Sequence, residues 1–138
     1  MVVDKTISIL HFEDNKVFQS LVKDYLKSEL DVSVRQERTL RNAETLLDPL
    51  CASIYDVIIC DWMFPYKDAS SILNLLADCG KTVIFYSCID HDDFYKKCYS
   101  QLGYMPRSFK YIQKASANNL KNIRQLKRSC HQSPTTEK

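Results

Sequence analysis

The sequence is poor in glycine, since its 138 residues contain only Gly80 and Gly103. A nucleotide-binding P-loop, a dinucleotide-binding G-x-G-x-x-G turn and a glycine-rich kinase loop each need several closely spaced glycines. These loops are therefore excluded, and any phosphate group that the protein binds must be held by other means.

The sequence also lacks closely spaced pairs of cysteines, although it contains six cysteines. No two of them are spaced as C-x-x-C, which argues against a structural zinc site. Cys60 and Cys88 lie within apolar runs, where a free thiol behaves as a small hydrophobic group. A disulfide framework is the alternative, but a chain of this length can build a core without one. We therefore expect reduced thiols.

Long hydrophobic runs are absent as well. No apolar stretch approaches the ~20 residues that a membrane-spanning helix needs, and the start, MVVDK, does not have the pattern of a signal peptide. We expect a cytoplasmic protein without membrane contact. The length, with 45% hydrophobic and 26% charged residues, fits one domain. We place this domain at residues 1–130 and expect a polar tail, disordered or the start of a linker, at 131–138.

Acidic residues are scarce in the last part of the chain. Residues 107–138 contain eight Lys or Arg and a single acid, Glu137, whereas residues 1–106 contain eleven basic and sixteen acidic residues. A basic final helix is most simply a solvated face, and a docking surface for an acidic partner is the alternative. No recognition motif accompanies the charge, which argues against nucleic-acid binding.

Short apolar runs alternate with helical patterns along the chain. Continuous apolar runs are typical of strands that are covered on both faces of a parallel sheet, and apolar residues three or four positions apart are typical of helices with one buried face. The alternation predicts a doubly wound (βα)5 fold of the α/β class, in which helices cover both faces of a five-stranded parallel sheet. We predict strands at 6–12, 31–37, 55–60, 82–86 and 109–113, and helices at 17–26, 40–50, 68–78, 91–102 and 116–130.

Polar side chains follow four of the predicted strands. Glu13 and Asp14 follow the first strand, Asp61 the third, Ser87 the fourth and Lys114 the fifth. Because the carboxyl ends of parallel strands meet at one edge of the sheet, where open α/β folds bind ligands, we expect these side chains to lie together.

The residue types of this cluster indicate phosphoryl chemistry. Three neighbouring carboxylates repel one another unless a cation lies among them, and hard oxygen ligands suit Mg²⁺. A lysine and a hydroxyl can bind the oxygens of a phosphoryl group, and a carboxylate can attack phosphorus to form an aspartyl phosphate. The cluster predicts an aspartate that accepts a phosphoryl group with the help of Mg²⁺.

Four segments of the chain resemble the receiver domain of two-component response regulators. The resemblance covers about residues 5–130 and is carried by ILHFEDN (9–15), DVIICDWMFP (56–65), TVIFYS (82–87) and YIQK (111–114). It implies a chemotaxis-regulator-like, flavodoxin-like fold with strand order 2-1-3-4-5. It also implies a signalling module that catalyses only its own phosphorylation and dephosphorylation and is not otherwise an enzyme.

The resemblance assigns the metal and phosphoacceptor roles. Asp61 would be the phosphoacceptor. Glu13, Asp14 and Asp61 would bind Mg²⁺, with the backbone carbonyl of Met63 as a further ligand. A histidine kinase or a phosphotransfer protein would donate the phosphoryl group.

The resemblance also assigns the switch. Ser87 would bind the phosphoryl group, Lys114 would pair first with Asp61 and then with the phosphate, and Tyr111 would be the aromatic residue that turns inward when Ser87 moves. A downstream protein would bind the face formed by the fourth helix, fifth strand and fifth helix. No output domain follows residue 130, so we expect either a stand-alone regulator or a piece of a larger one.

Several positions depart from the family pattern. The usual Lys-Pro with a cis bond is Lys114-Ala115, which we expect to be trans because a cis bond before alanine costs ~3 kcal/mol. The usual Asp-Gly is Asp68-Ala69, Cys88 stands where a smaller residue is common, and the stretch before Lys114 is long, with 104–108 as the expected insertion. These departures concern the switch, so the alternative function is a degenerate receiver that binds partners without phosphorylation.

The same residues also fit other assignments. Asp61 alone could be a helix cap. An aspartyl phosphatase would have an acid where Met63 stands, and a flavin carrier would not place acidic residues at 13 and 14, where they repel a phosphate. We expect Trp62 and Phe64 to lie in a loop that covers the site or contacts a partner, and His11 to be packed or hydrogen-bonded within its strand.

Overall fold

The computed structural model describes residues 6–114 and 120–131, which form a five-stranded parallel sheet of order β2-β1-β3-β4-β5. This confirms the predicted fold class and strand order. The strands are β1 (Ile7–Phe12), β2 (Val32–Glu37), β3 (Val57–Cys60), β4 (Thr82–Ser87) and β5 (Phe109–Gln113).

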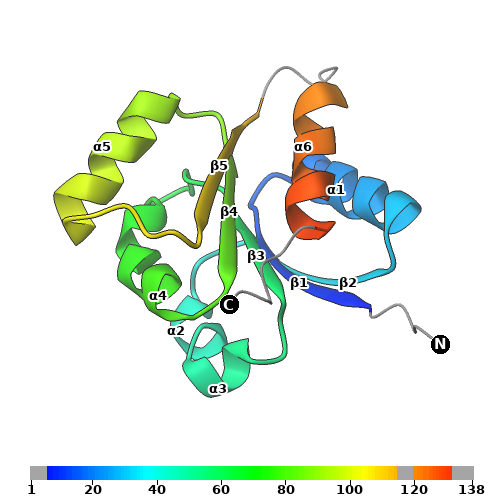
Figure 1. Cartoon of the computed structure of the whole chain (residues 1–138), viewed down its shortest axis with the longest axis horizontal. Coiled ribbons are helices and arrows are strands. Elements are labelled where there is room, and N and C mark those ends of the chain that lie inside the picture. Colours follow the sequence, from blue (N-terminus) through cyan, green and yellow to red (C-terminus); the bar gives the residue numbers. More distant parts are fainter. Residues whose placement is uncertain (1–5, 115–119, 132–138) are drawn as a thin grey trace.

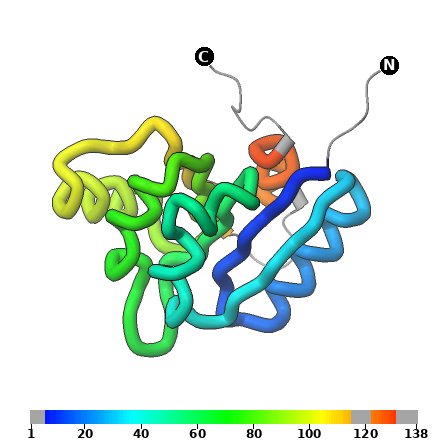
Figure 2. Tube along the Cα trace, turned by 90° about the horizontal axis from the view of Figure 1, so that it is seen from below, coloured from blue at the N-terminus to red at the C-terminus, as the bar shows by residue number. Residues whose placement is uncertain are grey.

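Helices cover both faces of the sheet (Figure 1). One face packs against α1 (Lys16–Glu29) and α6 (Leu120–His131), and the other faces the remaining helices. Figure 2 shows β1 and β2 running side by side, with α1 along their outer side. The remaining helices are α2 (Ala43–Leu46), α3 (Pro49–Ala52), the 3-10 helix η1 (Ala69–Ile72), α4 (Leu73–Asp78) and α5 (His91–Leu102).

The central strands lie between two hydrophobic cores, and this explains their unbroken apolar runs. Every residue of β3 and β4 is buried, as expected for strands covered on both faces. In β2, at the edge of the sheet, intermediate and exposed residues alternate instead. The strands that end at the site are thus anchored on both faces of the sheet.

The predicted helix at 40–50 is wrong, because the chain forms two short helices there. The Asp48 carboxylate caps α3 by accepting a hydrogen bond from the Leu50 N–H, and Pro49 is the first residue of α3. A residue before proline avoids helical backbone angles, and Asp48 has a ψ of 137°. Proline is favoured at a helix start, so Asp48-Pro49 ends one helix and begins another.

The predicted helix at 68–78 is also divided. Asp68 caps the 3-10 turn η1 by accepting a hydrogen bond from the Ser70 N–H, and the α-helical part begins only at Leu73. Similarly, β3 begins at Val57 rather than at residue 55.

The stretch at 104–108 lies at the end of the sheet opposite the predicted site. Gly103, with φ of 84°, caps α5, and the following residues lead into the first residue of β5. Because the predicted site lies at the carboxyl ends of the strands, a longer connection here does not border it.

Some expectations fall on other parts of the chain. The Lys114-Ala115 turn, the start of the predicted helix at 116 and residues 132–138 lie outside the described residues. All six cysteines have free thiols. No helix in the described ranges is both long and apolar enough to cross a membrane.

Candidate functional site

The register of the sheet brings the predicted site residues to one edge. Phe12, the last residue of β1, pairs with Cys60, the last residue of β3. Glu13 and Asp61 come directly after this pair, and the Asp61 N–H donates to the Phe12 carbonyl at 3.0 Å. On the other side, Ser87 pairs with Gln113, and the Lys114 N–H donates to the Ser87 carbonyl at 2.7 Å.

A cavity of about 350 Å³ opens at this edge. Its wall includes five predicted side chains and two neighbours from the loop after β3: Glu13, Asp14, Asp61, Ser87, Lys114, Met63 and Phe64. Of the predicted site residues, Tyr111 does not line the cavity.

Lys114 connects the two carboxylates on the floor of the cavity. Its Nζ lies 2.6 Å from Glu13 Oε1 and 2.8 Å from Asp61 Oδ2, and its side chain is only 3% exposed. The second oxygen of Asp61 accepts a hydrogen bond from the Trp62 N–H at 2.7 Å, and that of Glu13 accepts one from the Asn15 N–H at 3.1 Å. These bonds fix the orientation of both carboxylates.

Three carboxylates converge closely enough to share one cation. Glu13, Asp14 and Asp61 each offer an oxygen within 4.8 Å of the other two. Asp14 is half-buried, whereas Glu13 and Asp61 are buried. This donor set of hard oxygens fits Mg²⁺, which binds through a few carboxylates and keeps water or phosphate oxygens as its other ligands. Met63 lines the same cavity.

Burial perturbs the protonation of this cluster. Burial, and next the charge of Asp61, raise the pKa of Glu13 to about 7. Burial alone would lower the pKa of Lys114, but the charges and hydrogen bonds of Asp61 and Glu13 outweigh it and raise that pKa. The lysine therefore remains charged, and Glu13 holds a proton more readily than an ordinary glutamate does.

Ser87 places a buried hydroxyl group beside the cavity. Its side chain is 0% exposed, and Oγ has no hydrogen-bond partner among the described residues. Leaving a buried hydroxyl unpaired is unfavourable, so this oxygen is suited to a ligand that enters the cavity. The neighbouring Cys88 is exposed and also lines the cavity.

Tyr111 already lies inward. Its ring stacks on Phe94, with centroids 4.7 Å apart and planes at 25°. Its hydroxyl donates to the Ser87 carbonyl at 3.1 Å and also to the Ile89 carbonyl. Burial raises the pKa of this hydroxyl, so it remains a donor. Ring stacking and hydrogen bonding thus hold Tyr111 against Phe94 and the end of β4.

The expectation for Trp62 is wrong. Its side chain is 0% exposed and packs in the core, with its ring centroid 6.0 Å from that of Phe85 and 5.8 Å from that of Phe94. It therefore neither covers the site nor contacts a partner. Phe64 is 8% exposed and lines the cavity, as expected for a residue that covers the site.

His11 is buried, as expected. Its Nδ1 lies 3.1 Å from the Gln36 amide nitrogen, and burial lowers the pKa of its imidazole to about 3. The histidine is therefore neutral near pH 7 and belongs to the packing beneath the site.

Two aromatic residues beside Lys114 were not predicted. Phe18 of α1 and Tyr86 of β4 both face its ammonium group. Phe18 follows the helix cap Asn15 by three residues, so its distance from the acidic pair is fixed by the first turn of α1. Nothing in the sequence predicts that Phe18 contacts Lys114, which lies far along the chain.

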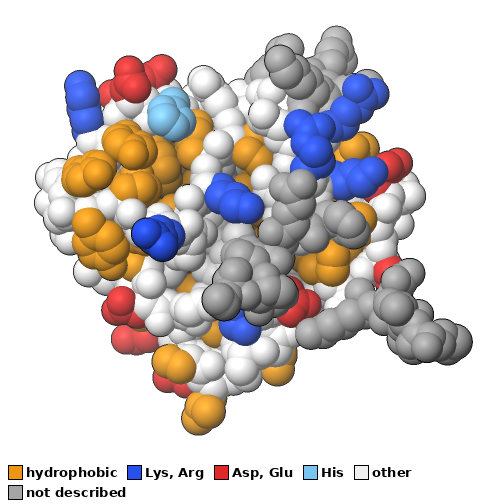
Figure 3. Space-filling view, viewed as in Figure 1, with side chains coloured by type: hydrophobic (Ala, Val, Ile, Leu, Met, Phe, Trp, Pro, Cys, Tyr) orange, Lys and Arg blue, Asp and Glu red, His pale blue; other side chains and the backbone are white. Residues whose placement is uncertain are grey.

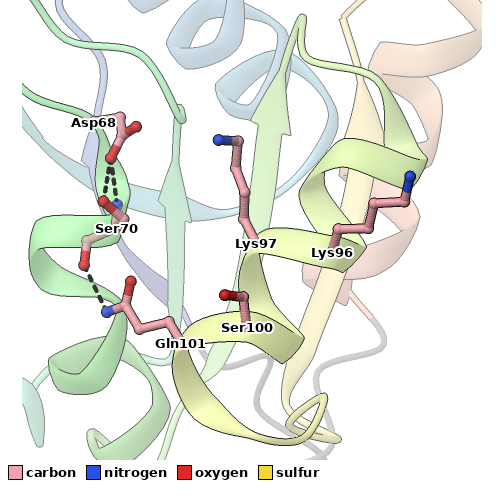
Figure 4. Close-up of a pocket in the computed structure, with 6 residues that line it drawn as sticks. All are labelled: Asp68, Ser70, Lys96, Lys97, Ser100 and Gln101. Carbon is pink, nitrogen blue, oxygen red and sulfur yellow. Dashed lines mark hydrogen bonds between the residues drawn. The ribbon is translucent and has the colours of Figure 1, made fainter.

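A second hollow lies beside the loop that departs from the family pattern. Figure 4 shows it between the start of η1, which carries Ser70, and α5, which carries Lys97 and Gln101. The Gln101 amide donates to the Ser70 carbonyl at 2.8 Å, and the Ala69 N–H donates to the Trp62 carbonyl. These hydrogen bonds connect the Asp68-Ala69 turn and the start of η1 to α5 and to the loop after β3, although the turn contains no glycine.

No family model matches the sequence, and no curated protein matches it. Solved structures do match. The receiver domain of the Francisella response regulator 1452 has 22% identity and a TM-score of 0.67, over 91% of this chain and 94% of that one. The response regulator domain of Thermotoga maritima CheB has 17% identity and a TM-score of 0.73, over 97% and 100%.

A third structure, the non-phosphorylated HemR receiver domain from Leptospira biflexa, has 17% identity and a TM-score of 0.69, over 96% of this chain and 98% of that one. At these identities the likeness establishes the fold. Together with the strand order 2-1-3-4-5, it shows that the chain has the CheY-like receiver fold.

Proposed function

We propose that the protein is a phosphoacceptor receiver, in which Asp61 takes a phosphoryl group from a histidine kinase or a phosphotransfer protein. The observation that carries this proposal is the convergence of Asp61, Lys114 and the unpaired Ser87 hydroxyl in one cavity beside three clustered carboxylates. A helix cap would explain Asp61 alone, but it would not explain the buried lysine and hydroxyl that face the same space.

The reaction follows from these side chains. A carboxylate oxygen of Asp61 attacks the phosphorus atom, and the bond from phosphorus to the donor nitrogen breaks as the new P–O bond forms. Lys114 turns from Asp61 toward a phosphoryl oxygen, and Ser87 donates its hydroxyl to another. Glu13, Asp14 and Asp61, with the Met63 carbonyl, would hold Mg²⁺, which supplies positive charge to the phosphoryl oxygens.

The proposed output surface is the face formed by α5, β5 and α6. Figure 3 shows hydrophobic side chains gathered over α5 and Lys and Arg side chains over α6. On α5, His91 stacks on Tyr95 and Tyr95 contacts Tyr99, and all three are exposed. A downstream protein with acidic and apolar groups would match this surface.

The observation on Tyr111 favours a second candidate, a receiver whose output surface is formed without phosphorylation. Its ring is held inward by Phe94 and by two carbonyls. NMR spectra recorded with Mg²⁺, before and after addition of beryllofluoride, distinguish the two candidates. The first requires shifts at Tyr111 and along α5, and the second requires that these signals stay in place.

Phosphorylation itself is tested with acetyl phosphate and Mg²⁺, followed by phosphate-affinity electrophoresis. We expect a shifted band for the wild type and none for Asp61→Asn. Asp24→Asn, which changes an exposed acid of α1, is the matched control and should shift like the wild type. An equal shift in Asp61→Asn, or no shift in the wild type, would contradict the proposal.

A further inference from the structure

The Lys114 ammonium lies against two aromatic faces as well as two carboxylates. Its Nζ is 4.2 Å from the centroid of the Phe18 ring and 5.7 Å from that of Tyr86. Both distances are within the ~6 Å over which a cation is attracted to the face of a ring. The two rings also contact each other edge to face, with centroids 6.4 Å apart.

These rings face the part of the ammonium group that the carboxylates leave free. An ammonium has three N–H donors, and its hydrogen-bond acceptors among the described residues are Glu13 and Asp61. The lysine side chain is 3% exposed, so bulk water has little access to it. Attraction to the rings therefore stabilises a charge that is otherwise costly to bury.

We infer that Phe18 and Tyr86 form an aromatic cage that positions Lys114 for phosphoryl transfer, with Phe18 as a positioning residue at the cavity wall. This inference rests on the proposed function. When an oxygen of Asp61 bonds to phosphorus, its negative charge is lost and its ion pair with Lys114 weakens. A ring face attracts the cation without fixing one donor direction, so the ammonium can turn from Asp61 to a phosphoryl oxygen while remaining in place.

The location of Phe18 supports a role beyond packing. It is half-buried, and its side chain lines the same cavity as Asp61 and Lys114. Tyr25, two turns further along α1, is also a half-buried aromatic residue packed against the same core. Tyr25 neither lines the cavity nor faces a lysine among the described residues, so it offers a matched control.

The test compares the wild type with Phe18→Leu, Phe18→Tyr and Tyr25→Leu. The maximal rate of phosphorylation by acetyl phosphate and the Mg²⁺ concentration for half-maximal rate are measured for each. We expect Phe18→Leu to lower the maximal rate about five- to thirtyfold, the factor that corresponds to a cation–π contact at a partly to fully desolvated site, without changing the half-maximal Mg²⁺ concentration. Phe18→Tyr, which keeps a ring, and Tyr25→Leu should both stay within twofold of the wild type, since neither removes the ring beside Lys114.

NMR of the unphosphorylated protein gives a second measurement that does not depend on phosphoryl transfer. The ring current of Phe18 should move the side-chain proton signals of Lys114 upfield in the wild type and in Tyr25→Leu, and the shift should be clearly smaller in Phe18→Leu, where only the more distant Tyr86 ring remains. If the wild type lacks this shift, or if Phe18→Leu and Tyr25→Leu slow phosphorylation equally, the cage is overturned. A wild type that shows the shift but takes no phosphoryl group overturns the proposed function, while the placement of Lys114 by Phe18 stands.

Discussion

The two halves of the candidate site differ in how completely their polar groups are paired. In the acid–lysine half (Glu13, Asp61 and Lys114), every carboxylate oxygen accepts a hydrogen bond and the lysine joins the two acids. In the switch half (Ser87 and Tyr111), the Ser87 hydroxyl has no partner among the described residues, whereas the Tyr111 hydroxyl has two. The first half is fully paired within the protein, whereas the second combines a tyrosine hydroxyl held by two carbonyls with an unpaired serine hydroxyl.

The difference corresponds to where the sequence departs from the receiver pattern. The acids, the lysine and the hydroxyl stand at the expected strand ends, and the departures at Ala69 and Cys88 lie in the connections that follow β3 and β4. The proposed chemistry and the proposed switching should therefore be separable, and four variants or conditions test whether the halves are independent.

The largest effect is expected for Lys114→Ala. Removing the cation leaves two buried carboxylates without their partner, and breaking such a buried pair costs about 3 kcal/mol or more in free energy of unfolding. Urea unfolding without metal should show this loss, and Mg²⁺ should restore part of it. Lys110→Ala on β5 is the control, because Lys110 has no ion pair within residues 6–114 and 120–131. Equal losses in the two variants would refute a stabilising role for the cluster.

Ser87→Ala should stabilise the unphosphorylated protein but lower the yield of phosphorylated protein. It removes a buried unpaired hydroxyl, so the unphosphorylated protein should gain about 1 kcal/mol in free energy of unfolding. The yield of phosphorylated protein should fall, because a donor to the phosphoryl group is lost. Ser28→Ala, which deletes an exposed hydroxyl that donates to the Tyr25 carbonyl, should not raise stability. A destabilised Ser87→Ala protein would show that the hydroxyl is already satisfied.

Mg²⁺ affinity should depend on pH through Glu13. Burial, followed by the charge of Asp61, raises the pKa of Glu13 to about 7, and a carboxyl must lose its proton to bind the metal. Affinity should therefore rise with pH, being about tenfold weaker at pH 6 than at pH 8. Titration calorimetry at both pH values measures this change. Glu13→Gln should bind more weakly and lose most of the pH dependence, and a pH-independent wild type would contradict the prediction.

Tyr111→Phe should have the smallest effect. The ring can still stack on Phe94, but the carbonyls of Ser87 and Ile89 lose their donor, which costs about 1 kcal/mol in free energy of unfolding. The phosphorylation rate should not change if the halves are independent. Tyr99→Phe, at an exposed position, should leave both quantities unchanged. A slower rate in Tyr111→Phe alone would show that the halves are coupled.

The sheet and the edge that carries the site were predictable because both follow from chain order. Apolar runs mark the strands, and the residues that follow them must gather where parallel strands end. The sequence pattern does not reveal the break at Asp48-Pro49, because Leu46, Leu47 and Leu50 keep a helical spacing across it. The local cap and the proline decide that structure, and periodicity does not contain them.

Contacts between distant segments could not be predicted from the sequence. Trp62 follows Asp61 in a segment expected to be a loop, and only the structure shows that its ring packs against Phe85 and Phe94. The same holds for Phe18 beside Lys114, since that contact depends on how the first turn of α1 meets the end of β5. Residue types predict the proposed chemistry, and three-dimensional packing determines which side chains surround the site.

The central claim is that Asp61 accepts a phosphoryl group, and peptide mass spectrometry tests it most directly. After incubation with acetyl phosphate and Mg²⁺, we predict a single phosphoryl group on the peptide that contains Asp61, absent when Mg²⁺ is chelated and absent in Asp61→Asn. Unmodified wild-type protein, or a phosphoryl group on another residue that survives in Asp61→Asn, would contradict the account.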